Sequence, residues 1–204
     1  MQEVIDEIAL HNKKVFSISE AARIMNKPKN YVSKLLATNK KVRRIERGKY
    51  YLWDGRAIDI YEIASQVAFP SYVSMFAALQ FYSLTEQSVV RYNVIALQRH
   101  RPLNVENYII EFVKIKKERF FGYRKTGNAY VATVEKAIID SLYLGSPPIS
   151  YVEEAFAESF DKGMIDVELL VDFTLRMKTK ATARKVAALL QSRNINSKRL
   201  QEIS

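Results

Sequence analysis

The sequence predicts an α+β fold with two parts: a small N-terminal module of three helices and a hairpin, then a larger mixed α+β domain with a helical C-terminal tail. Apolar residues recur at helical spacing across the first 38 residues, and segments rich in β-branched and aromatic residues follow. Between 89 and 131 such segments return, and from 133 the period is helical again. We expect a first domain at 1–55, a connecting segment at 56–69 and a second domain at 70–204.

Three helices are predicted in the N-terminal module. The first is about ten residues long, ends near His11-Asn12, and packs through Val4, Ile5, Ile8 and Ala9. The second follows a capping box in which Ser17 and Glu20 satisfy each other's backbone donors. The third starts at Pro28, whose missing N–H needs no partner in a first turn, and runs to about Thr38.

The third predicted helix has two contrasting faces. Val32, Leu35 and Leu36 lie on one of them, while short polar and basic side chains lie on the other. A second helix held by apolar contacts that offers such side chains to the major groove is the helix-turn-helix arrangement. The candidates for base contacts are Lys29, Asn30, Ser33 and Lys34.

A basic hairpin is predicted directly after this helix. The segments 42–45 and 49–53 flank a tight turn at 46–48. A basic helix followed by a basic hairpin is the order of a winged helix-turn-helix, whose wing meets phosphates or the minor groove. The candidates for DNA-backbone contacts are Lys27, Arg43, Arg44, Arg47 and Lys49.

The charge of the chain favours a polyanionic partner. Lys and Arg number 32 against 22 Asp and Glu, a formal net charge of +10. Nine positive residues and one acid lie within 27–49, which places the densest positive charge on the predicted helix and wing. Double-stranded DNA is therefore the expected partner. A winged adaptor that engages a protein instead is the alternative, because short helices and hairpins also serve that role.

Composition excludes several other classes of protein. The chain has no cysteine, so disulfides, thiol nucleophiles and cysteine zinc sites are excluded. Apolar runs are too short to span a bilayer, and the N-terminus does not have the pattern of a signal peptide. We expect a cytoplasmic protein without a membrane partner.

The second domain is predicted as one sheet followed by helices. A short helix is expected within 54–69 and another from Pro70 to about Leu84. Strands are expected at 89–97, 108–115, 119–123 and 129–131. A helix follows from Thr133, and at least three more occupy 150–193.

A second basic surface is a candidate in this domain, formed by Lys114, Lys116, Lys117, Arg184 and Lys185. For the window 114–125 two interpretations stay open, an exposed sheet edge protected by charge and a contact with the DNA backbone. For the basic residues of the last helix, a second DNA contact and an ordinary solvated face are equally open.

Two segments of the second domain resemble a known family. The segment PSYVSMFAAL at 70–79, followed by FYSLT at 81–85, resembles the first signature of AbiEi-type regulators, and YVATVEKAIID at 130–140 resembles their second. The resemblance implies a transcriptional repressor that is the antitoxin of a type IV toxin–antitoxin pair in phage defence. It further implies that the winged domain binds the operon's own operator, and that the second domain counteracts a nucleotidyltransferase-like toxin.

No enzyme class is supported by the remaining motifs. Glu135, Lys136 and Asp140 form the only compact polar set, and a structural helix with a Lys136–Asp140 pair is expected there. A nuclease site is disfavoured because Glu111 and Lys114, three apart in a strand, point to opposite faces. Neither His11 nor His100 is next to a convincing partner carboxylate, and no phosphate-binding loop motif is present. We expect no catalytic residue, metal or cofactor, and the sequence leaves the oligomeric state open.

Overall fold

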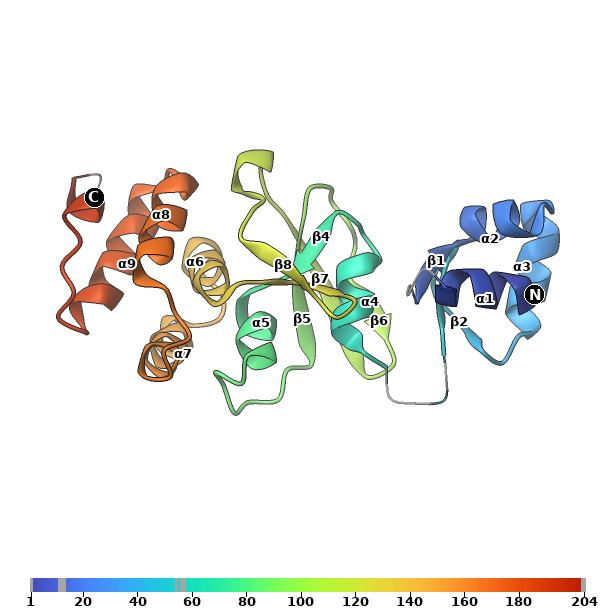
Figure 1. Cartoon of the computed structure of the whole chain (residues 1–204), viewed down its shortest axis with the longest axis horizontal. Helices are drawn as coiled ribbons and strands as arrows, with labels where there is room; N and C mark the ends of the chain where they lie inside the picture. Colours follow the sequence, from blue (N-terminus) through green and yellow to red (C-terminus); the bar gives the residue numbers. More distant parts are fainter. Residues whose placement is uncertain (1, 11–13, 54, 56–57, 203–204) are drawn as a thin grey trace.

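The computed structural model describes residues 2–10, 14–53, 55 and 58–202. The chain runs along the long axis of the molecule, from the N-terminal module through a six-stranded sheet to a group of C-terminal helices (Figure 1). The predicted α+β class is confirmed: a three-stranded antiparallel sheet with helices, a six-stranded mixed sheet, and a helical C-terminal region.

The N-terminal module combines three helices with a small sheet in the strand order β1-β3-β2, antiparallel throughout. Its elements are α1 (Gln2–Leu10), β1 (Val15–Ser17), α2 (Ile18–Met25), α3 (Lys29–Thr38), β2 (Val42–Glu46) and β3 (Lys49–Leu52). The three helices and the hairpin are confirmed, while β1 was not predicted, because three residues are too few to show a period. The expected end of the first helix, at His11-Asn12, lies outside the described residues.

Local capping explains where the two central helices begin. The Ser17 hydroxyl accepts from the Glu20 N–H at 3.1 Å and the Glu20 carboxylate accepts from the Ser17 N–H at 2.7 Å, which confirms the capping box. Asn26 ends α2 in the left-handed conformation, with φ 49°. Pro28 is the N-cap of α3, one position before the first helical residue.

The two faces of the small sheet pack into different hydrophobic cores. Phe16 and Tyr50 point towards the helices and pack with Val32 and Leu36 of α3. Val15 and Tyr51, one residue along each strand, point the other way and pack with the apolar residues of the second domain. Because side chains alternate along a strand, residues next to each other in the hairpin lie on opposite faces of the sheet.

The second domain is centred on a mixed sheet in the order β6-β7-β5-β4-β9-β8. β5 pairs in parallel with β7, β4 pairs in parallel with β9, and the remaining pairs are antiparallel. Its strands are β4 (Ser71–Val73), β5 (Arg91–Ala96), β6 (Leu103–Val105), β7 (Tyr108–Lys114), β8 (Tyr123–Thr126) and β9 (Ala129–Ala132). α4 (Ile60–Gln66), the helix expected within 54–69, packs against β4 and β9.

Two predicted elements of this domain are wrong. The helix expected from Pro70 begins only at Met75, as α5 (Met75–Phe81), and the residues before it form β4. All three residues of β4 are buried, and a strand covered on both faces has no alternation that would distinguish it from a buried helix. The strand expected at 119–123 is instead the end of the 3-10 helix η1 (Lys117–Arg119) and a loop, and the true strand β8 starts at Tyr123.

The C-terminal half is helical, as expected. It consists of α6 (Val134–Leu144), α7 (Ile149–Asp161), α8 (Val167–Met177), α9 (Lys180–Gln191) and α10 (Lys198–Gln201). α6 is central, since it packs against α5, α7, α8 and α9. None of the helices in the described ranges has the length and apolar character needed to cross a membrane.

Candidate nucleic-acid interface

A groove of about 570 Å³ lies between the start of α3 and the turn of the β2–β3 hairpin. Its lining combines three of the predicted base-contact residues with two arginines of the wing and no acidic residue. The lining residues are Ile18, Lys29, Asn30, Ser33, Arg44, Arg47, Gly48 and Tyr50. The fold therefore brings the polar face of α3 and part of the predicted wing to one site.

The polar face of α3 is accessible. Lys29, Asn30 and Lys34 are exposed and Ser33 is half-buried, while Val32 and Leu36 anchor the opposite side in the core. Neither lysine has a side-chain partner within the described residues. The Asn30 Oδ1 accepts from the Tyr31 N–H at 2.8 Å, so in this conformation the amide nitrogen is the group left to contact a ligand.

The wing contributes Arg44 and Arg47 to the same groove. Arg44 is opposite Tyr50 in the β2–β3 register and shares its face, and its Nε donates to the Glu46 carbonyl at 3.1 Å. Arg47 is exposed in the turn beside Gly48, whose φ of 79° is favourable for glycine and strained for other residues. Lys27, also predicted as a backbone contact, is exposed in the turn between α2 and α3.

The other two predicted wing residues, Arg43 and Lys49, lie on the opposite face of the small sheet. Arg43 pairs with Glu106 of the second domain at 2.8 Å and stacks over the Trp53 ring, 4.1 Å from its centroid. Lys49 pairs with Glu46 at 3.0 Å and donates to the Val67 carbonyl. Both residues therefore join the N-terminal module to the second domain. The sequence pattern had grouped all four wing residues because it carried no information about a second domain behind the sheet.

The junction between the N-terminal module and the second domain combines an apolar contact with hydrogen bonds and ion pairs. The Tyr51 hydroxyl donates to Glu106 at 2.9 Å, and burial together with the Glu106 carboxylate raises the pKa of Tyr51 to about 12. His100 Nε2 lies 3.2 Å from the carboxylate of Glu46. His100 therefore has a partner carboxylate, but one that is 54 residues away along the chain, on β2. Burial raises the pKa of Glu46, but the hydrogen bonds and charges of Lys49 and His100 outweigh it and leave that pKa below its ordinary value.

The residues of the second predicted basic surface come from separate elements. Lys114 ends β7, which lies inside the sheet, so edge protection does not explain it; Arg124 and Lys125 are the basic residues on the edge strand β8. Lys116 and Lys117 are exposed around η1. On α9, Arg184 and Lys185 are exposed, and Lys185 also donates to the Leu142 carbonyl at 2.9 Å.

The compact polar set of α6 is buried rather than open to solvent. Lys136 pairs with Asp140, which confirms the predicted pair, and both side chains are fully buried. Asp140 also accepts from Ser74 at 2.7 Å and Tyr72 at 3.1 Å, while Glu135 accepts from the Asp166 N–H. Burial raises the pKa of Asp140 and lowers that of Lys136, and their attraction offsets only part of each shift. Such a cluster joins β4, α6 and α8, which supports the structural role expected from the sequence.

Within the ranges that the structure describes, no three His, Asp or Glu side chains are grouped so that they could hold a metal ion. No family model matches the chain, and no curated protein matches it.

Proposed function

We propose that this protein binds double-stranded DNA through the α3–wing groove and represses transcription from the DNA to which it binds. The observation that carries the proposal is the convergence of Lys29, Asn30, Ser33, Arg44 and Arg47 around one open groove. α3 enters the major groove in this arrangement, and the hairpin turn lies along the neighbouring phosphates.

The charge distribution supports a duplex over a protein partner. Within 27–49, only Arg43 and Lys49 form ion pairs with acidic residues among the described side chains. The remaining cations of this segment keep their charge available for phosphates, and release of counterions by such contacts supplies most of the affinity that is independent of sequence.

The two AbiEi-type signatures, at 70–85 and 130–140, suggest what the DNA is. In that family the operator belongs to the protein's own operon, so the upstream region of the gene is the first duplex to test. Action as the antitoxin to a nucleotidyltransferase-like toxin is the further role that the resemblance favours.

The test is titration of a labelled duplex from that upstream region, with fluorescence anisotropy at several salt concentrations. Replacing Arg44 or Arg47 by Ala should weaken binding to all duplexes and reduce the slope of log K against log salt by about 1 for each phosphate that is no longer neutralised. Replacing Asn30 by Ala should instead change the preference between the operator and a scrambled duplex.

Arg43→Ala is the matched control. Arg43 is the neighbour of Arg44 on β2 but lies on the opposite face, so its removal should leave the salt slope unchanged. A flat salt dependence of the wild-type protein, or the same slope change for Arg43→Ala and Arg44→Ala, would contradict the proposal. Association with a protein partner without any duplex binding would favour the adaptor alternative.

A further inference from the structure

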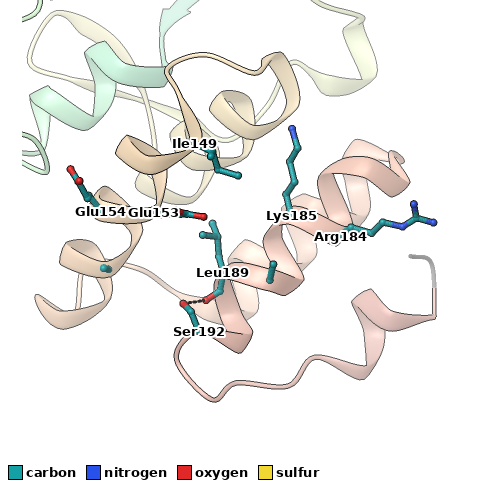
Figure 2. A pocket seen from close by; sticks show the side chains of 9 residues that line it. Ile149, Glu153, Glu154, Arg184, Lys185, Leu189 and Ser192 are labelled. Carbon is teal, nitrogen blue, oxygen red and sulfur yellow. Dashed lines mark hydrogen bonds between the residues drawn. The ribbon is translucent and has the colours of Figure 1, made fainter.

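A second groove, of about 710 Å³, lies between α7 and α9 at the end of the molecule remote from the winged module. Its floor is apolar and combines the small side chains of Ala157 and Ala188 with Leu189. Ile149 lines one end of it and is 51% exposed, an unusual exposure for an isoleucine. Figure 2 shows Ile149, Glu153 and Leu189 converging in the space between the two helices.

The two sides of this groove carry opposite charges. Glu153 and Glu154 lie on the α7 side, and neither forms an ion pair within the described part of the chain. Arg184 and Lys185 lie on the α9 side. Glu154 and Arg184 extend outward from their helices, away from the floor (Figure 2).

We propose that this groove is the interface for a second copy of the chain, with α7 of each copy packed against α9 of the other. In a two-fold interface residue i contacts residue j, and j contacts i. When the two-fold axis runs along the groove, the acidic side of each copy faces the basic side of the other, and the contact between Glu153 and Arg184 of opposite copies occurs twice. The small residues of the floor allow the helices to approach closely, and Ile149 of each copy covers the floor of the other.

The charges of the groove favour a second copy over other occupants. Duplex DNA would meet the carboxylates of Glu153 and Glu154, which repel phosphates. A different protein would need its own matched acidic and basic sides, whereas a second copy supplies them. The balanced charges of the groove also make it a place where two chains, each with a formal net charge of +10, can meet with less repulsion than at their basic surfaces.

The dimer is expected to be weak, because the groove is small and the net charges of the two chains oppose association. Added salt has two opposite effects, since it screens the overall repulsion and also weakens the ion pairs. The measurement therefore compares variants at one salt concentration.

Sedimentation equilibrium of the full-length chain, without DNA, tests the interface. The wild-type chain should dimerise, and E153R and R184E should each weaken the dimer at least tenfold by placing like charges opposite each other. An equimolar mixture of E153R and R184E should associate again, because each interface then contains opposite charges. E118R, which changes an exposed carboxylate on η1, is the matched control and should dimerise like the wild type.

If circular dichroism shows that R184E is unfolded, a steric variant still tests the interface. Ala188→Trp fills the floor and leaves the charges unchanged, so it should abolish the dimer, while Ala181→Trp, on the same helix but outside the groove, should not. A wild-type chain that stays monomeric at about 1 mM, an Ala188→Trp variant that still dimerises, or a mixture of folded charge variants that fails to associate would overturn the proposal. Since the measurement uses no DNA, its outcome is separate from that of the proposed function.

Discussion

Replacing Lys136 by Met tests how much the buried polar cluster contributes to stability. The side chains of Lys136 and Asp140 are both 0% exposed, and methionine fills nearly the same volume as lysine. The substitution therefore removes the charge and keeps most of the packing around Phe121 and Met177. Asp140 would remain buried with only the hydroxyl donors of Tyr72 and Ser74. Leaving one buried charge without its partner costs about 3–5 kcal/mol of unfolding free energy.

The cost should depend on pH, with a defined sign. Burial already raises the pKa of Asp140 above its ordinary 3.8, and removal of the Lys136 charge raises it further. Between the unfolded pKa and the folded pKa the native state binds more protons than the unfolded state, so stability falls as pH rises through that window. The destabilisation by Lys136→Met should therefore be largest above the folded pKa of Asp140, and it should shrink in acid, where Asp140 is neutral in both states.

Urea unfolding followed by circular dichroism at pH 7 and at pH 5 measures both effects. The double variant K136M/D140L, which removes both charges, should recover much of the stability, because the penalty comes from the unpaired carboxylate. A cost below about 1 kcal/mol at pH 7, or a double variant less stable than Lys136→Met alone, would refute this account of the cluster.

Three further predictions concern single contacts. Tyr72→Phe removes a hydroxyl that donates to Asp140 and should cost about 1.5–3 kcal/mol in urea unfolding, with Tyr31→Phe, at an exposed site, as the control. Gly122→Ala should lower the free energy of unfolding by about 2–4 kcal/mol, because φ is 72° and an added Cβ would lie 2.8 Å from Phe173 and 2.9 Å from Lys136. Its control is Gly127→Ala, where φ is 59° and the space around the added Cβ is open, so the loss should be only about 1 kcal/mol. Glu106→Gln removes one of the causes that raise the pKa of Tyr51, so this pKa should fall from about 12 towards 10.0 while burial keeps it above that value. Carbon NMR of labelled tyrosine measures it, and Arg43→Ala should shift it the opposite way.

The sequence predicted best those elements whose signals are local. The Ser17–Glu20 capping box, the hairpin after α3 and the i,i+4 pair of α6 each depend on residues close together in the chain, and each is confirmed. The helix expected from Pro70 was wrong because β4 lies in the middle of the sheet and shows no alternation. Its burial depends on β5 and β9, which lie about 20 and 60 residues away along the chain and are invisible to a local pattern.

For the candidate interface, the sequence identified the residues of α3 but not the division of the wing. Of the four predicted base-contact residues, Lys29, Asn30 and Ser33 line the groove and Lys34 does not. To predict that Arg44 lines the groove while Arg43 contacts Glu106, one must know that the second domain covers the other face of the sheet. The consecutive aromatic residues Tyr50 and Tyr51 were the signal available in the sequence, because neighbouring residues of a strand point to opposite faces and two large apolar side chains there indicate a core on each side; both are buried in the structure.

The small sheet joins the candidate interface to the second domain through a single hairpin. Arg44 and Tyr50 face α3 and the groove, while Arg43 and Tyr51 face Glu106 of the second domain. A change at the junction therefore acts on the strands that carry the wing, without touching a residue of the groove. A duplex that requires a fixed angle between α3 and the second domain should lose affinity when Glu106 is replaced, whereas one bound by the winged module alone should not. In the proposed α7–α9 dimer, a junction that keeps its geometry would hold the two N-terminal modules at one spacing, which favours DNA half-sites separated by that spacing.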